Sequence, residues 1–98
     1  MNQKDAAQLR DVAARYIWWE SPEEALRRPV RVLAQVMDKG DFQDIVRILS
    51  LIGPAPFREA ITEAEPGWFG PQAWHYWHYR LGFVPAGEVV PDLPQRSF

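Results

Sequence analysis

Two histidines lie in a strongly aromatic segment, residues 74–80, which reads WHYWHYR. His75 and His78 are three positions apart, so on a helix both imidazoles could approach one metal ion. A stable metal site generally needs three or four ligands, and only Glu88 and Asp92 in the C-terminal tail could join them. The sequence has no cysteine, no third histidine and no H-E-x-x-H motif. We therefore expect packing histidines with one polar edge, and no metal.

The acidic and hydroxyl side chains form no recognisable catalytic pattern. The 13 carboxylates are scattered over helix caps and exposed helix faces, where they have structural roles. Ser21 is expected to cap a helix, and Ser50 and Ser97 have no adjacent base. There is no Gly-rich phosphate loop and no G-x-S-x-G motif. We expect a protein without enzymatic activity and without a cofactor.

The aromatic residues are the most unusual feature, because 98 residues include five tryptophans. On a wheel of about 100° per residue, Trp74, Trp77 and Leu81 form the inner face of the last helix, with His78 beside them. Tyr76 and Arg80 lie on one flank of that face, and His75 and Tyr79 lie on the other.

Some aromatic rings outside this inner face should reach the surface. Trp18 and Trp19 point about 100° apart, so both cannot lie in the apolar stripe of the first helix. Trp68 precedes the last helix in a Pro-Gly turn. Exposed Trp, Tyr and Arg side chains are typical anchors of protein interfaces. We predict a partner-binding face formed by Trp18, Trp19, Trp68, Tyr76 and Arg80.

A helix-turn-helix that binds DNA is the alternative. Residues 30–38 and 42–52 have suitable lengths around a turn at Gly40. The outward face of the second helix would carry Gln43, Arg47 and Ser50. However, Asp41 and Asp44 would lie where that helix should approach a phosphate backbone, and the net charge is −2. A small DNA-binding transcriptional regulator therefore remains the second hypothesis, and nucleic acid is the less favoured partner.

Three arginines, Arg27, Arg28 and Arg31, form the densest basic cluster. They could contact phosphate, but Glu23 and Glu24 lie within one helical turn and are expected to pair with them. Nine of the eleven basic residues are arginine, which favours paired or interfacial contacts over a general positive field.

These side chains are positioned by short helices, and no other element is predicted. The apolar periodicity, the prolines and the glycines indicate helices over residues 6–17, 22–28 with a restart at Pro29, 30–38, 42–52, 56–64 and 71–82. The predicted fold is all-α, a compact bundle of five to six short helices arranged as stacked hairpins. Residues 30–38 and 42–52 are expected to be its central hairpin. Residues 1–82 would form a single helical domain, and residues 83–98 an extended Pro-rich C-terminal tail.

Local signals predict how the two central helices begin, end and pack. Gly40 offers a left-handed stop, and Asp41 offers an N-cap for the next helix. The first helix of the hairpin should leave Arg31, Gln35 and Asp38 for solvent. The second should bury its apolar residues, which are Phe42, Ile45, Val46, Ile48, Leu49 and Ile52.

Composition limits the classes of protein that this chain can belong to. It is 47% hydrophobic and 24% charged, as in an ordinary globular domain, and it is too apolar for disorder. Without cysteine it can form neither disulfides nor thiolate sites. No signal-peptide pattern and no apolar run of about 18 residues is present. We expect a cytoplasmic protein that does not associate with membranes.

Three segments carry a family resemblance: RYIWWESPEEALRRPVRVLAQVMDKGDFQDIVRILSLIG, FREAI and AWHYWHYRLG. Residues 14–82 resemble a family of small bacterial helical proteins without an assigned biochemical activity. Its members share an aromatic-Trp pair, a helical hairpin and a Trp-rich ending before Leu-Gly. They are commonly encoded beside abortive-infection-type nucleotidyltransferase toxins, which implies an antitoxin or toxin-partner role. The tail after Gly82 departs from this pattern, and the resemblance assigns no functional residue.

Overall fold

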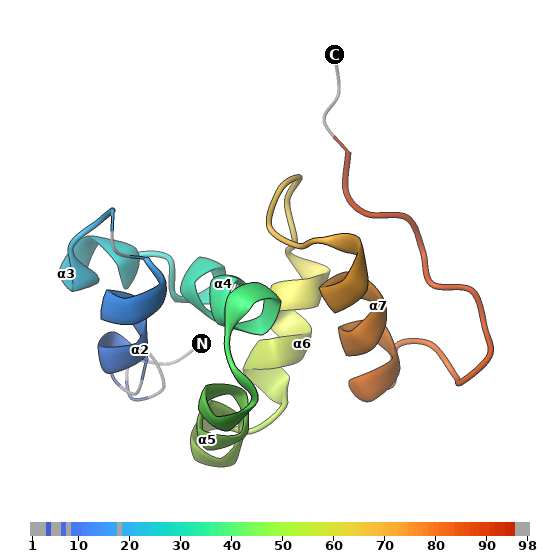
Figure 1. Ribbon diagram of the computed structural model, residues 1–98, viewed down its shortest axis with the longest axis horizontal. Coiled ribbons are helices and arrows are strands. Elements are labelled where there is room, and N and C mark those ends of the chain that lie inside the picture. The colour runs from blue at the N-terminus through green and yellow to red at the C-terminus, as the bar shows by residue number, and fades with distance from the viewer. Residues whose placement is uncertain (1–3, 5–6, 8, 18, 96–98) are drawn as a thin grey trace.

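The structure is a computed structural model that describes residues 4, 7, 9–17 and 19–95. Within these ranges the helices are Arg10–Tyr16 (α2), Pro22–Ala25 (α3), Pro29–Lys39 (α4), Phe42–Ile52 (α5), Ala55–Thr62 (α6) and Pro71–Arg80 (α7), and no residue is in a strand (Figure 1). The all-α prediction is confirmed. The radius of gyration is 13.2 Å, close to the value of about 13 Å for a compact chain of this length. No helix in the described ranges has the length and apolar character that spanning a membrane requires.

Helix α4 is the centre of the fold. It contacts each of the other five helices, with α2 and α3 on one side and α6 and α7 on the other (Figure 1). Val32, Leu33, Ala34 and Val36 are fully buried, which fits the broad apolar arc of this helix. Its contacts with every other helix make α4 the main support of the fold.

One polar residue of α4 does not face solvent as expected. The Asp38 side chain is only 10% exposed, and its carboxylate accepts a hydrogen bond from the backbone N–H of Gly70 at 2.9 Å. Gly70 is the N-cap residue of α7. The prediction that Asp38 is solvent-facing is therefore wrong, because this carboxylate ties the start of α7 to the end of α4.

The predicted start and stop signals of several helices are confirmed. The Ser21 hydroxyl accepts a hydrogen bond from the N–H of Glu24 at 3.2 Å, and Pro29 is the first residue of α4. The Asp41 carboxylate accepts from the N–H of Asp44 at 2.9 Å and so caps α5. Gly53 follows α5 with a φ of 78°, in the left-handed region that only glycine adopts readily.

Gly40 ends α4 in a different way from the prediction. Its φ of −68° and ψ of 153° are extended, so the expected left-handed stop is wrong. The extended conformation leads directly into Asp41, which is itself extended as an N-cap. Glycine is still needed here, because a Cβ atom on Gly40 would lie 2.4 Å from the backbone oxygen of Val36.

Replacing Gly40 with alanine is expected to lower the free energy of unfolding by about 1–3 kcal/mol, because backbone atoms must move to admit the methyl group. Urea unfolding followed by circular dichroism measures this change. Gly70→Ala is the matched control, since its Cβ would meet only Asp38 Oδ1, at an ordinary 3.6 Å. That variant should stay within about 1 kcal/mol of the parent protein. Equal effects of the two substitutions would contradict the steric explanation.

Beyond α7, residues 83–95 contain neither helix nor strand, yet they contact the helix. The indole N–H of Trp74 donates a hydrogen bond to the carbonyl of Pro91 at 2.8 Å. Val90 is only 6% exposed and belongs to the hydrophobic core. The part of this segment that the structure describes therefore packs along α7.

Candidate partner-binding site

The aromatic segment in α7 divides into an inner face and exposed flanks, as its helical spacing predicts. Trp74, Trp77, His78 and Leu81 are all buried, with Trp77 only 1% exposed. The Trp77 indole N–H donates to the carbonyl of Met37 at 3.0 Å. This bond fastens α7 to the end of α4.

Both histidines use a ring nitrogen within their own helix. His75 Nδ1 lies 2.7 Å from the carbonyl of Pro71, and His78 Nδ1 lies 2.8 Å from the carbonyl of Trp74. A carbonyl oxygen can only accept, so each Nδ1 must carry the proton. Among the described residues, no group of three or more His, Cys, Asp or Glu side chains is arranged to hold a metal ion.

Tyr76 and Arg80 form an exposed pair on one flank of α7. Tyr76 is 45% exposed, and Arg80 Nη1 donates to the Tyr76 hydroxyl at 2.8 Å. The Arg80 guanidinium also lies 5.9 Å from the ring centroids of Tyr76 and Trp77. Two of the predicted anchor residues are thus adjacent on the surface, and each limits the conformational freedom of the other.

The other predicted anchors are not part of the same surface. Trp19 is 53% exposed, but it lies in the connection between α2 and α3, on the far side of α4 from α7 (Figure 1). Trp68 is only 7% exposed, so the prediction that it is an exposed anchor is wrong. The guanidinium groups of Arg28 and Arg31 lie over its ring, which explains the burial. Trp18 lies outside the described residues.

Helix α5 exposes apolar residues that the sequence pattern predicts to be buried. Phe42 is 69% exposed and Val46 is 38% exposed, so the burial predicted for both is wrong. Leu51 is 50% exposed, and Ile48 is the one apolar residue of this helix in the buried class. The reason is the position of α5 at the edge of the bundle, where it packs mainly against α4 and α6 (Figure 1). Residues 42–52 are consequently not half of a central hairpin.

An apolar groove lies between the start of α5 and the outer flank of α7. Its volume is about 340 Å³, and the side chains of Met37 and Trp77, both buried, form its floor. Phe42 and Tyr76 form exposed parts of its wall, and Ile45 also lines it. We call these residues, together with Arg80, the α5–α7 groove. Sequence analysis found Tyr76 and Arg80 from the helical wheel but missed Phe42, because an exposed apolar stripe has the same periodicity as a buried one.

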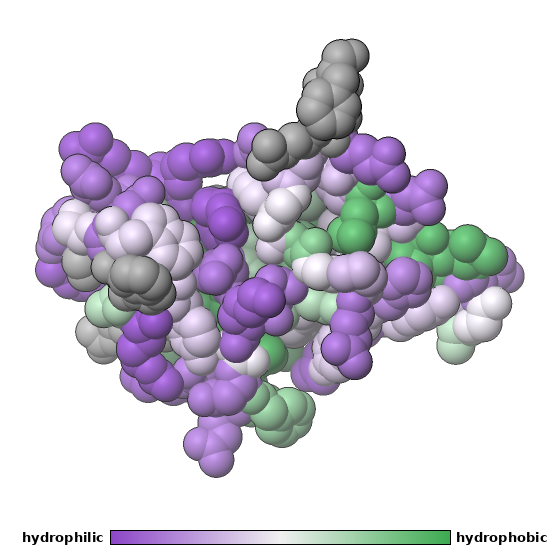
Figure 2. Space-filling view, turned by 45° about the horizontal axis from the view of Figure 1, so that its top comes forward, coloured by the Kyte–Doolittle hydropathy of each residue, from purple (hydrophilic) through white to green (hydrophobic). Residues whose placement is uncertain are grey.

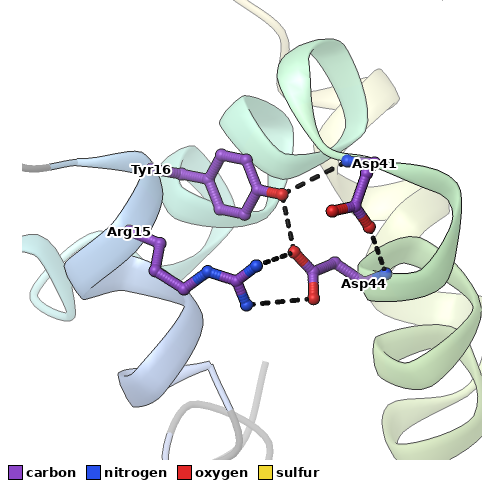
Figure 3. Close-up of polar contacts among 4 residues, drawn as sticks. All are labelled: Arg15, Tyr16, Asp41 and Asp44. Carbon is purple, nitrogen blue, oxygen red and sulfur yellow. Dashed lines mark hydrogen bonds and ion pairs between the residues drawn. The ribbon is translucent and has the colours of Figure 1, made fainter.

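A polar network holds the start of α5, and with it the groove, in place (Figure 3). Two nitrogens of the Arg15 guanidinium donate to the Asp44 carboxylate at 3.2 and 2.8 Å, and the Tyr16 hydroxyl donates to the same carboxylate at 2.6 Å. The Tyr16 hydroxyl in turn accepts from the N–H of Asp41 at 3.2 Å. Burial, followed by the hydrogen bond to Asp44, raises the pKa of Tyr16. Asp44 is 7% exposed, so its charge is directed at Arg15 and not at solvent.

The surface around these features is mostly hydrophilic. Figure 2 shows one face of the molecule, on which hydrophobic residues reach the surface only in separate places. Those at the right-hand edge coincide with the C-terminal segment, where Val89 is 89% exposed. Phe42 and Tyr76 are both exposed and both line the α5–α7 groove, so an apolar surface is available there to a partner.

The basic cluster has different partners from those expected. Glu23 pairs with Arg10 of α2, and Arg28 Nη2 lies 2.6 Å from the carboxylate of Glu65. The predicted pairing of Glu23 and Glu24 with the cluster is therefore wrong for Glu23, and among the described residues the structure gives no ion pair for Glu24. Arg10 and Glu65 are far in sequence from the residues with which they pair. Sequence spacing alone therefore could not predict these ion pairs.

No protein-family model, curated protein or solved structure significantly matches this chain. What it binds must therefore be inferred from its own surface. The α5–α7 groove and the exposed apolar face of α5 lie side by side, and both begin at Phe42.

Proposed function

We propose that this protein is a non-enzymatic binding protein whose α5–α7 groove receives a partner protein. The observation that supports this most directly is the exposure of Phe42 beside a groove with a buried apolar floor. When a partner covers such a side chain, its apolar surface is removed from water. This burial contributes about 25 cal/mol of favourable binding free energy for each Å² of apolar surface. A groove of this composition accepts apolar side chains more readily than a charged substrate.

The shape of the surface favours an amphipathic helix of the partner as the segment that docks. Phe42 and Val46 are exposed one helical turn apart on α5, and Ile45 between them lines the groove, a spacing that matches the side chains of a second helix laid against it. Arg80 and Tyr76 at one side of the groove supply a charged donor and a phenolic hydroxyl at the rim. Aromatic and arginine anchors of this kind supply most of the energy of protein interfaces.

We further propose that the partner is a nucleotidyltransferase-type toxin and that this protein acts as its antitoxin. The resemblance of residues 14–82 to proteins encoded beside such toxins supports this identity. Charge complementarity supports it as well, because a toxin that handles nucleotides or nucleic acid needs a basic substrate site, whereas this chain has a net charge of −2.

The test is co-expression of the full chain with the product of its neighbouring gene, which the proposal expects to be a nucleotidyltransferase-type toxin, followed by affinity purification and calorimetry. The double variant Phe42→Asp, Tyr76→Ala is expected to weaken binding by about 100-fold or more, as the loss of two interface anchors does. Val89→Asp is the matched control, since Val89 is an exposed apolar residue of the C-terminal segment outside the groove. Unchanged toxin binding by the double variant would reject the groove as the docking surface.

DNA binding is the alternative that the same samples can test. Gln43, Arg47 and Ser50 are all exposed on α5, as a recognition helix would require. The same helix exposes Phe42, Val46 and Leu51, which have no polar group to offer a phosphate backbone. A gel shift that is abolished by Arg47→Ala and strongly weakened by salt would favour DNA binding over the protein partner.

A further inference from the structure

A second cavity lies on the opposite side of α4, between the end of α2, helix α3 and the start of α4. Its volume is about 530 Å³, within the range of about 300–1,000 Å³ that small-molecule sites occupy. Three arginines, Arg27, Arg28 and Arg31, and two glutamates, Glu20 and Glu24, are among the residues that line it. The cavity is therefore basic although the chain as a whole is acidic.

Two of these arginines are held in place by the fold. The guanidinium carbons of Arg28 and Arg31 lie 5.7 and 5.4 Å from the ring centroid of the buried Trp68. Arg28 is also paired with Glu65, and Arg31 lines both this cavity and a smaller one of about 220 Å³ beside Trp68. Side chains that are already ordered lose little conformational freedom when a ligand binds.

The positive charge of the cluster is incompletely compensated. Burial, followed by the like charge of Arg28, lowers the pKa of Arg31. Arg27 is exposed, and within the described part of the chain the structure gives its guanidinium group no hydrogen bond or ion pair, although its backbone N–H donates to the Glu24 carbonyl. Glu23, four positions before Arg27, pairs with Arg10 instead. An anion in the cavity would relieve the repulsion between Arg28 and Arg31 and would give Arg27 a partner.

We propose that this cavity binds a small organic phosphate of mononucleotide size. Guanidinium groups donate paired hydrogen bonds that match a phosphate group. Trp19 and Ile17 supply an aromatic and an aliphatic part of the wall, suited to a flat base. The carboxylates of Glu20 and Glu24 can accept hydrogen bonds from hydroxyl or amino groups of the ligand. This site is separate from the α5–α7 groove and does not depend on the proposed partner.

The test is calorimetric titration of the full chain, in a buffer free of phosphate, with adenosine monophosphate, inorganic phosphate and adenosine. Adenosine monophosphate is expected to bind saturably, inorganic phosphate more weakly, and adenosine not at all. Arg27→Gln should weaken binding of adenosine monophosphate by about tenfold or more, the loss expected for a charge-assisted contact. Arg27 is exposed, so this variant should fold normally.

Arg47→Gln is the matched control, because Arg47 is another exposed arginine that lies on α5, outside the cavity. Its affinity for adenosine monophosphate should equal that of the parent protein. Absence of saturable binding at millimolar ligand would overturn the proposal. So would an equal loss of affinity in Arg27→Gln and Arg47→Gln, which would indicate general charge attraction, or binding of adenosine as tight as that of its phosphate.

Discussion

Replacing Trp77 with alanine is expected to lower the free energy of unfolding by about 3–5 kcal/mol, the largest effect of any single substitution proposed for this protein. The side chain is 1% exposed, and its ring centroid lies 5.3 Å from that of Phe57. Its indole N–H also supplies the hydrogen bond to the Met37 carbonyl. Domains of this size are generally stable by about 5–15 kcal/mol, so the variant should unfold readily on warming.

Two further variants help to interpret the loss of stability in Trp77→Ala: one separates the hydrogen bond from the packing of the ring, and the other is a control. Trp77→Phe retains an aromatic ring but leaves the Met37 carbonyl without its donor, so a loss of about 1–3 kcal/mol is expected. Gln72→Ala, at an exposed position of the same helix, should change the free energy of unfolding by less than about 0.5 kcal/mol. Urea unfolding monitored by circular dichroism measures all three. A loss below 1 kcal/mol for Trp77→Ala would contradict the central packing role of this ring.

Replacing Asp44 with alanine is expected to lower the free energy of unfolding by about 2–4 kcal/mol. This carboxylate is 7% exposed and accepts hydrogen bonds from both Arg15 and Tyr16 (Figure 3). Removing it leaves the guanidinium and the phenol without their shared acceptor. The start of α5 would then be less firmly positioned, so the α5–α7 groove should also bind its partner more weakly.

Replacing Asp44 is expected to lower the free energy of unfolding more than replacing either of its partners, Arg15 or Tyr16. Arg15→Ala should lower the free energy of unfolding by only about 0.5–1 kcal/mol, since its side chain is 56% exposed and solvent can replace the lost contact. Tyr16→Phe should lower it by about 1 kcal/mol. A double-mutant cycle between Arg15 and Asp44 measures the coupling. If Asp44→Ala were no more disruptive than Arg15→Ala, the buried carboxylate would not be the centre of the network.

Sequence alone determined the helical class and most helix boundaries. Proline removes a backbone donor and restricts the preceding residue, which explains the starts at Pro29 and Pro71. The caps at Ser21 and Asp41 act within three residues of their partners. The wheel of α7 also separated Trp77 from the exposed Tyr76 correctly. All of these signals are local, so they operate before any tertiary contact forms.

Only the tertiary structure decided which helix faces are buried and which residues the charged side chains contact. The periodicity of α5 shows that Phe42 and Val46 share a face, but that this face stays exposed in the described part of the chain follows from the place of α5 in the bundle. Trp68 is buried because it joins the core and because the start of α4 brings Arg31 and the preceding Arg28 over its ring. These outcomes depend on residues distant in the sequence. Periodicity determines which side chains lie together on a helix, and only the packing of helices determines whether that face is core or surface.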